Sequence, residues 1–359
     1  MSAAAEFFLI ALAIYLWEST LWLPLRTAVL RRRPFSSRWS AVRPGQWMST
    51  REFGLVAMLP GFPDSGLAPT QAPPLLATAD GTVLLETASG DLVGCGAPSW
   101  EDIKVEAGRL TIGGISARVS SPRMIDLFRR AKKRGLAPAE GIADAWGKAM
   151  SPGHAAKEWR RWQLVSSPLR PLCLTLTLGF FAGLPVTYIH AGILPMLGIV
   201  LFLWLLMLVV ACRLWWLSRR VYPAAKAALR GDALLCCVVP FHAMRALELA
   251  SVHAMATTHP SALLLSTGDT RNPWLASFSR SLLHPRPDVP HDDDRTALIR
   301  PLLEKALASQ GARISDYEAI PPNSGDEAAA RFCPRCLSVF GSGRGTCSDC
   351  RGVPLKEFP

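Results

Sequence analysis

The stretch that decides the fold runs from Pro171 to Cys212 and reads PLCLTLTLGFFAGLPVTYIHAGILPMLGIVLFLWLLMLVVAC. It contains no Lys, Arg, Asp or Glu. A membrane-spanning helix needs about 20 apolar residues, so the stretch has room for two spans, which we place at Leu172–Ile189 and Ile193–Trp216. Both must be helical, because the bilayer interior offers the backbone no other hydrogen-bond partners. The alternative is a long helical hairpin buried in a soluble core, and the length of the uncharged run argues against it.

The composition of the whole chain agrees with a membrane protein. Its 359 residues are 50% hydrophobic and 19% charged, whereas soluble domains contain roughly 25% charged residues. The mean hydropathy is +0.21. These values exclude a collagenous, a disulfide-dense or a wholly disordered chain, and the length allows two or three domains.

A third apolar run extends from Phe7 to Leu25 and is interrupted only by Glu18. A secretory signal carries basic residues before its apolar core, whereas here the arginines follow the run, beginning at Arg26. We therefore predict an uncleaved transmembrane anchor over residues 1–25, with the N-terminus outside.

Glu18 is the only acid inside a predicted span. An intramembrane carboxylate is a candidate for proton relay or another function. The hydroxyls of Thr175 and Thr177, on the second span, are expected at a depth where they could pair with it. We favour packing, or a side chain that reaches the membrane interface, over a functional role.

Basic residues set the expected orientation, because short basic flanks stay in the cytoplasm. Seven arginines and no acid lie between Arg26 and Arg51. The flanks of the hairpin are also basic, through Lys157, Arg160, Arg161, Arg170, Arg213, Arg219 and Arg220. We predict a multi-pass inner-membrane protein of bacterial type, with residues 26–170 and 217–359 in the cytoplasm. The net charge of +11 is then best explained by attraction to anionic inner-leaflet headgroups, and nucleic acid is the less favoured partner.

The predicted fold class is a mainly α membrane protein with three transmembrane helices, a small cytoplasmic antiparallel sheet-plus-helix domain and a C-terminal metal module. Asp80-Gly81 predicts a tight hairpin between two short strands, and Ser121-Pro122 predicts the start of a helix that ends near Gly135. The expected segments are an anchor (1–25), a basic juxtamembrane linker (26–52), a sheet-plus-helix domain (53–170), a transmembrane hairpin (171–217), cytoplasmic or interfacial helices (218–282), a linker with one helix (283–330) and the module (331–359).

Two C-x₂-C pairs near the C-terminus predict a metal site. They are Cys333-Pro334-Arg335-Cys336 and Cys347-Ser348-Asp349-Cys350, separated by a glycine-rich return. Each pair forms a tight turn that points two thiolates at one ion, and four thiolates favour zinc first and iron second. Disulfides or free thiols are the alternatives, and a reducing cytoplasm argues against disulfides. Four protein ligands leave no open position for water, so the expected zinc is structural.

Residues 332–355 resemble the small zinc-ribbon modules at the ends of many bacterial proteins. The resemblance implies a compact module held together by one zinc ion. The chain departs from the pattern at two positions. Leu337 stands where such modules carry glycine after the first pair, and Arg351 displaces the second glycine by one position.

Two other clusters are weaker candidates. His242, His253 and His259 lie in one stretch near Glu248, but helical spacing keeps them too far apart for one metal, so we interpret them as ordinary surface or interfacial residues. Asp292-Asp293-Asp294 could bind a divalent cation, but we expect them to begin a helix, where negative charge is favoured.

The expected function is interaction rather than catalysis. We predict a membrane-anchored cytoplasmic adaptor or assembly factor that recruits a protein partner through its soluble domain and zinc ribbon. One alternative is a subunit of a membrane-embedded enzyme or transporter that uses Glu18. A second is a membrane-tethered nucleic-acid-binding regulator, for which the ribbon offers four arginines, Arg331, Arg335, Arg344 and Arg351.

Overall fold

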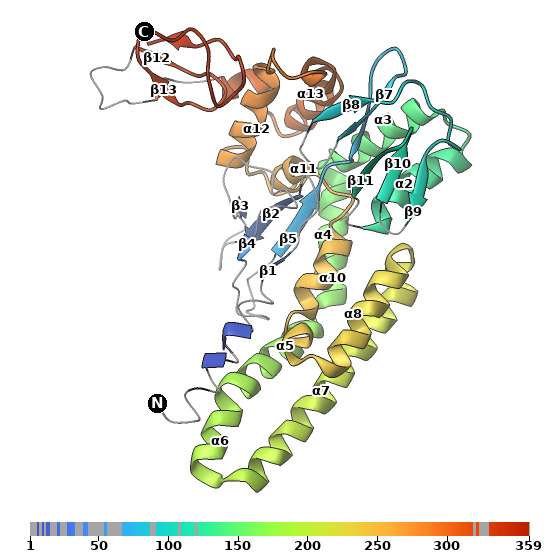
Figure 1. Cartoon of the computed structure of the whole chain (residues 1–359), viewed down its shortest axis with the longest axis vertical. Coiled ribbons are helices and arrows are strands. Elements are labelled where there is room, and N and C mark those ends of the chain that lie inside the picture. The colour runs from blue at the N-terminus through green and yellow to red at the C-terminus, as the bar shows by residue number, and fades with distance from the viewer. Residues whose placement is uncertain are drawn as a thin grey trace.

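The computed structural model describes residues 6, 9–10, 12–14, 20–21, 27–32, 39–41, 54–55, 67–86, 91–106, 109–118, 121–318, 321–322 and 330–358 (Figure 1). The strands are β1 (Thr20–Leu21), β2 (Thr27–Arg32), β3 (Trp39–Ala41), β4 (Gly54–Leu55), β5 (Leu67–Gln71), β6 (Leu75–Ala77), β7 (Val83–Glu86), β8 (Leu92–Gly94), β9 (Lys104–Glu106), β10 (Arg109–Ile112), β11 (Ile115–Arg118), β12 (Arg331–Phe332), β13 (Val339–Phe340) and β14 (Lys356–Glu357). The helices are α2 (Pro122–Lys133), α3 (Pro138–Ala149), α4 (Pro152–Ser166), α5 (Leu169–Leu178), η1 (Gly179–Gly183), α6 (Leu184–Ala191), α7 (Ile193–Arg220), η2 (Pro223–Ala225), α8 (Lys226–Val238), α9 (Pro240–Met244), α10 (Ala246–Ala254), α11 (Pro260–Leu265), α12 (Pro273–Leu283), α13 (Asp292–Ala308) and η3 (Ile314–Tyr317).

Among the described residues, two helices are long and apolar enough to cross a membrane, as the uncharged stretch predicts. The first, Leu169–Ala191, combines α5, η1 and α6, and the second is α7. They meet at Gly192, whose φ of 82° makes the sharp turn possible. Only 17% of the most apolar window of each helix is buried, whereas a core helix of a soluble protein would be mostly buried. The pair projects from the rest of the molecule (Figure 1).

The two helices approach each other closely at Gly179. A β-carbon at this position would lie 2.5 Å from Cδ2 of Leu203 on α7, which is inside van der Waals contact. The close contact coincides with η1, a single π-helical turn that interrupts the first helix. Such turns interrupt the regular hydrogen-bond ladder of a helix. Glycine therefore allows the two backbones to pack together at this depth.

Small antiparallel sheets are present between the N-terminal segments and α2, as predicted. β6 and β7 form the expected hairpin around Asp80-Gly81, with Gly81 at a φ of 86°, and β8 continues this sheet. β9, β10 and β11 form a second three-stranded sheet. Helix α2 begins at Pro122, where Ser121 Oγ accepts from the amide of Arg123, and Gly135 follows its end at a φ of 75°.

The N-terminal segments contain more strand than the sequence pattern indicates. β2 and β3 lie within the expected basic linker, and β2 also pairs with β5, which lies within the expected sheet-plus-helix domain. β1 lies within the run expected to be a helical anchor and pairs with β4. Residues 6, 9–10 and 12–14 are helical. β2 and β3 form a local hairpin, but the β2–β5 and β1–β4 pairings join distant parts of the chain, so local periodicity does not reveal them.

The C-terminal helices complete the core rather than forming a linker. Ile299, Leu303 and Leu307 of α13 are buried in the same hydrophobic cluster as the sheets. The helix passes through Pro301 without ending there. α10, α11 and α12 also bury apolar side chains in this core. By contrast, Leu234, Leu235 and Val238 on α8 are exposed.

Arg123 joins the sheet-bearing part to the helices that lead into the apolar pair. Its Nη1 donates to the carbonyl oxygens of His253 (2.9 Å) and Ala254 (2.6 Å), and its Nη2 donates to Glu158 at 2.7 Å. The guanidinium also stacks 4.8 Å from the ring centroid of Tyr222, just beyond α7. One charged residue therefore contacts α4, α10 and the end of α7.

Candidate metal centre

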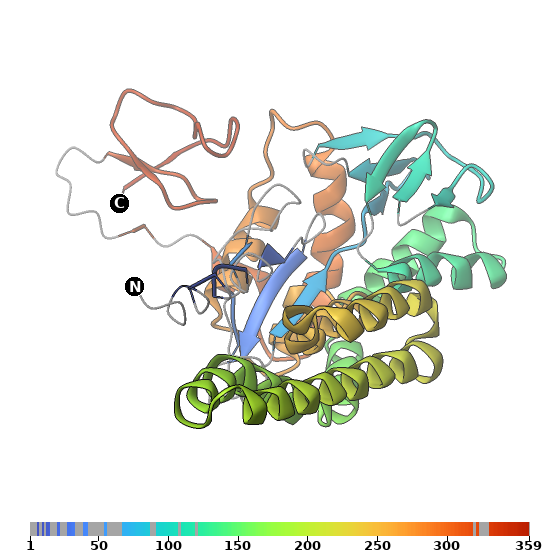
Figure 2. The ribbon, with the colours of Figure 1, turned by 60° about the horizontal axis from the view of Figure 1, so that its bottom comes forward.

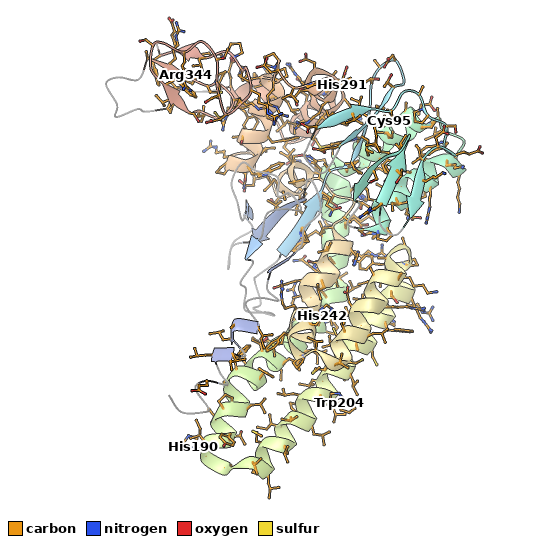
Figure 3. The ribbon with its side chains drawn as sticks, in the orientation of Figure 1. Cys95, His190, Trp204, His242, His291 and Arg344 are labelled. Atoms are coloured by element: carbon orange, nitrogen blue, oxygen red, sulfur yellow. The ribbon has the colours of Figure 1, made fainter. Side chains whose placement is uncertain are left out.

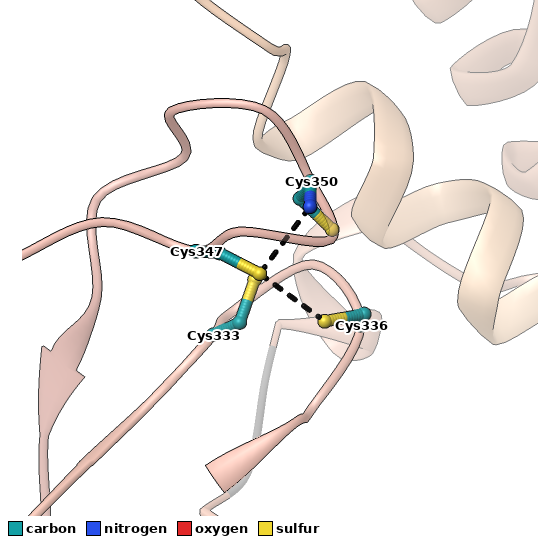
Figure 4. Close-up of side chains that lie close together, drawn as sticks. All are labelled: Cys333, Cys336, Cys347 and Cys350. Atoms are coloured by element: carbon teal, nitrogen blue, oxygen red, sulfur yellow. Dashed lines mark hydrogen bonds between the residues drawn. The ribbon is translucent and has the colours of Figure 1, made fainter. Parts of the chain in front are cut away.

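The four cysteines of the C-terminal module lie together. Two turns hold them, one between β12 and β13 and one before β14, and the three short strands pair in the order β13-β12-β14. All four sulfur atoms lie within 4.8 Å of one another (Figure 4). Cys333, Cys347 and Cys350 are buried, and Cys336 is exposed. The cysteines are close enough to bind one metal ion.

The sulfur geometry fits a tetrahedral ion. A tetrahedral zinc ion with Zn–S bonds of about 2.3 Å separates its sulfur ligands by about 3.8 Å. Cys336 Sγ and Cys347 Sγ are 3.7 Å apart. This is the only group of three or more His, Cys, Asp or Glu side chains with such an arrangement in the described part of the chain.

Backbone hydrogen bonds shape both cysteine turns. The amide of Leu337 donates to the carbonyl of Cys333 at 2.9 Å, and the amide of Cys350 donates to Cys347 Sγ at 3.4 Å. Leu337 and Arg351 have φ values of 66° and 47°, and Gly352 has a φ of 85°. The two residues that depart from the ribbon pattern therefore adopt the left-handed conformation that glycine would adopt without strain.

The thiols influence one another's ionisation. A hydrogen bond from Cys350 lowers the pKa of the Cys333 thiol to about 5. The same interaction raises the pKa of Cys350, and burial raises that of Cys347 to about 11. The proximity of the sulfur atoms therefore favours the thiolate form at Cys333 and the thiol form at Cys350. A bound cation would displace the thiol protons, because the thiolate is the ligand.

Arg335, between the first two cysteines, attaches the module to the helical core. Its Nη1 donates to the carbonyl oxygens of Ser281 (2.9 Å) and His284 (2.7 Å) at the end of α12. The same nitrogen lies 3.5 Å from the carboxylate of Asp292, the first residue of α13. In the opposite direction, Arg280 Nε donates to the carbonyl of Arg335 at 3.4 Å.

Asp292 is the centre of this attachment. Its carboxylate is 2% exposed and also receives Arg286 Nη2 at 3.2 Å and Arg295 Nη1 at 3.1 Å. Burial alone would raise the pKa of Asp292, but the hydrogen bonds from Arg286 and the charge of Arg295 hold it below its usual range. Three guanidinium groups therefore converge on one ionised carboxylate.

Further contacts on the second cysteine turn and the last strand strengthen the attachment. The backbone of Gly352 passes so close to the carboxylate of Asp288 that a β-carbon there would collide with it. Lys356 Nζ lies 2.9 Å from Glu318. The module is thus packed against the core rather than separated from it by a free tether.

The weaker candidates do not form a second metal site. His253 Nδ1 lies 3.1 Å from Ser121 Oγ, and His259 Nδ1 lies 2.6 Å from Ser261 Oγ. His242 is 3.5 Å from Asp232. The three histidines thus face separate groups and share no metal site, as expected. The expectation that they lie at the surface is wrong for His253 and His259, which are buried in the core because α10 and α11 pack against it.

Glu18 lies outside the described residues. Of the two threonines expected near it, Thr177 is buried and donates its hydroxyl to the carbonyl of Cys173 at 2.8 Å. This hydrogen bond lies within one helix and satisfies the hydroxyl hydrogen.

The acidic triplet begins α13, as predicted. Its role in holding the C-terminal module was not predicted from the sequence, and neither was that of Arg335. Two features of the sequence could have indicated this contact. They are the arginine inside the first C-x₂-C turn and the acidic triplet about 40 residues earlier, which together suggest an ion pair.

Comparisons with models of known protein families, with curated proteins and with solved structures gave no match.

Proposed function

We propose that this chain is a membrane-anchored cytoplasmic adaptor or assembly factor that presents a zinc-stabilised module to a protein partner. The observation that carries the proposal is the placement of the two distinctive features. The exposed apolar helix pair lies at one end of the molecule and the four-cysteine module lies at the other (Figure 1). An anchor and a recruitment module would be separated in this way.

The membrane assignment rests on exposed apolar surface. Large hydrophobic side chains are exposed along both helices of the pair, including Ile189, Leu194, Leu201 and Trp204. His190 marks the turn end of the pair, and Trp204 points away from the first helix (Figure 3). Burying this surface in lipid is favourable by about 25 cal/mol per Å². The basic residues at the opposite end, Arg219 and Arg220, favour a cytoplasmic location for the body of the protein.

We propose zinc as the ion of the cysteine module and a structural role for it. The sulfur spacing and the four-thiolate set fit zinc. The module's buried core consists of Cys333, Cys347, Cys350 and Val353, with Phe340 and Leu355 packed against it. Such a small core cannot hold a fold without help, and a metal would supply it.

The partner-facing surface is the side of the module formed by Val339, Phe340 and Arg344. Val339 is 36% exposed, and the guanidinium of Arg344 lies 6.0 Å from the ring centroid of Phe340. Arg344 projects at the outer end of the molecule (Figure 3). Phe340 is half-buried, and aromatic and arginine side chains are enriched at protein-binding surfaces.

The ribbon arginines favour a protein partner over nucleic acid. Arg331 pairs with Glu357 at 2.8 Å, Arg335 is committed to the core, and Arg351 lies 3.7 Å from Asp91. Three of the four candidate phosphate ligands therefore already contact acidic groups of the same chain. The embedded-enzyme or transporter alternative depends on Glu18 and gains no support from Thr177, whose hydroxyl bonds within its own helix.

Site-specific crosslinking in native membranes tests the proposal. A photo-crosslinking residue replaces Val339 in the full-length protein, and a control carries it at Gln310, an exposed position at the end of α13. We expect a discrete protein adduct from position 339, no such adduct from position 310, and loss of the adduct in Cys336→Ser. Identical adducts from both positions, or none, would contradict the adaptor function. An adduct to nucleic acid would favour the regulator alternative instead.

A further inference from the structure

A groove lies between the last turns of α7 and helix α8. It has a volume of about 620 Å³, and its lining includes Ala211, Trp215, Arg219, Arg220, Ala233 and Leu234. This volume is in the usual range for small-molecule sites. The two helices lie side by side (Figure 2), and they run in opposite directions, so the basic end of α7 meets the basic beginning of α8.

The groove has an excess of positive charge. From residue 213 to residue 238 the only acid is Asp232, against five basic residues, Arg213, Arg219, Arg220, Lys226 and Arg230. Arg219 and Arg220 form no ion pair with any carboxylate in the part of the chain that the structure describes. The charges of these two guanidinium groups, which line the groove, are therefore not neutralised by any carboxylate of the described residues.

Two neighbouring arginines stack on the tryptophans that line the groove. Arg230 stacks 4.4 Å from the ring centroid of Trp215, and Arg213 stacks 4.1 Å from that of Trp216. The Nε atoms of both arginines are buried without a hydrogen-bond partner. Neither arginine lines the groove, so both support the two lining tryptophans rather than contact an occupant.

The other side of the groove is apolar and continuous with the surface assigned to lipid. Leu234 and Val238 on α8 are 64% and 74% exposed, and Val209 on α7 is 50% exposed. The groove is therefore basic at the end nearest the body of the protein and apolar toward the helix pair. That order of chemistry matches a phospholipid, whose anionic headgroup lies at the interface above its acyl chains.

We propose that this groove binds one anionic phospholipid of the inner leaflet. The phosphate and anionic headgroup pair with Arg219 and Arg220, and an acyl chain packs along Ala211, Ala233 and Leu234. Tryptophans at the interface, here Trp215 and Trp216, frame the site. A soluble anion would leave the apolar half unfilled, and a zwitterionic lipid would leave the excess positive charge unneutralised. The proposal rests on the membrane placement argued above.

The test compares lipids with identical chains and different headgroups. Full-length protein in detergent is titrated with phosphatidylglycerol or phosphatidylcholine, and bound lipid is counted by native mass spectrometry. We expect one phosphatidylglycerol to bind at least tenfold more tightly than phosphatidylcholine. The double variant Arg219→Gln/Arg220→Gln should weaken phosphatidylglycerol binding about 30-fold, since each near-surface arginine contributes about a factor of five.

A matched control removes equal charge outside the groove. Lys157→Gln/Arg160→Gln neutralises two exposed residues of α4, and it should leave the affinity within about twofold. Equal binding of both lipids, an equal loss in the control, or a groove closed by a second copy of the chain without lipid would overturn the proposal. Release of the protein from membranes by alkaline carbonate would overturn the membrane placement instead, so the two failures are distinguishable.

Discussion

The guanidinium of Arg335, which lies between the two cysteines of the first metal-binding turn, is 3.5 Å from the carboxylate of Asp292 at the first turn of α13. A residue of the first cysteine turn therefore also forms the contact with the core. Any ion that fixes the conformation of the Cys333–Cys336 turn also fixes the direction of Arg335. Metal binding and attachment of the module are expected to stabilise each other, because both require the same turn.

The first prediction concerns the charge at the centre of this attachment. Asp292→Asn keeps the shape of the side chain but removes the negative charge shared by Arg286, Arg295 and Arg335. Loss of a buried ionic partner costs about 3 kcal/mol or more. We expect the module to detach, seen as faster amide hydrogen exchange in β12–β14, and its zinc affinity to fall, because attachment and metal binding require the same turn. Asp293→Asn, at an exposed neighbouring position, is the control and should change neither. Unaltered exchange in Asp292→Asn would contradict the attachment mechanism.

The second prediction concerns backbone strain in the second cysteine turn. Arg351 adopts a φ of 47°, a conformation that costs a residue with a β-carbon about 1 kcal/mol relative to glycine. Arg351→Gly should therefore raise the module's apparent zinc affinity up to about fivefold, and Arg351→Val, which is β-branched, should lower it. Competition with a chromogenic chelator measures both. The opposite order of the two variants would show that strain at this residue does not limit folding.

Local patterns predicted the helix pair and the cysteine cluster well. An uncharged run and paired C-x₂-C turns are local signals, because each depends on neighbours within a few residues. The same holds for the Asp80-Gly81 hairpin. The structure agrees with the expectation at each of these places.

Non-local contacts account for what the sequence did not reveal. β2 pairs with β5 across some 40 residues, and no periodicity within either segment indicates the partner. The charge of the arginine-rich segment near Arg31 predicts a linker at the membrane surface. Its strand forms through backbone hydrogen bonds, which the charge pattern does not indicate. Likewise, Asp292 and Arg335 come together only through the packing of α12 and α13 against the module, so their contact could not be inferred from spacing.

The third prediction concerns acid stability. His253 is buried, and burial lowers its pKa to about 4, a shift that the charge of Asp232 opposes and that of Arg123 reinforces. The folded protein therefore holds this imidazole neutral, whereas the unfolded chain binds a proton near pH 6.5. Its contribution to stability is full above pH 6.5 and declines as the pH falls toward 4, by at most about 3 kcal/mol. In His253→Gln the denaturation midpoint, measured in detergent, should depend less on pH over this range. The control His190→Gln, at the exposed helix turn, should lose stability with falling pH as the wild type does. A loss of the same size in His253→Gln would show that other groups cause it.

The fourth prediction concerns orientation. If the arginine bias sets topology, a reporter fused after Pro359 should be active only as a cytoplasmic reporter. Protease added outside intact cells should leave residues 26–170 uncut. Cleavage of that segment from outside would contradict the cytoplasmic placement. The same cells, once permeabilised, serve as the positive control for protease access.

The last prediction concerns the metal itself. Three of the four residues in the module's buried core are cysteines, so without an ion that core would consist largely of uncoordinated thiols. We expect about one zinc ion per chain in reduced wild-type protein, and clearly less in Cys336→Ser, measured by elemental analysis. Cys95→Ser is the control, because Cys95 lies outside the cluster, and it should keep the full zinc content.

Loss of zinc should also destabilise the contact between the module and the core, because Arg335 forms that contact. When the Cys333–Cys336 turn loosens, Arg335 withdraws from Asp292 and from the carbonyl oxygens of Ser281 and His284. Chelation of the wild-type protein should therefore speed hydrogen exchange at the end of α12 as well as in the module, while the apolar helix pair stays membrane-inserted. Absence of metal from carefully reduced wild-type protein would contradict the zinc site. Metal loss without any change in α12 would leave the site intact and refute its link to the core.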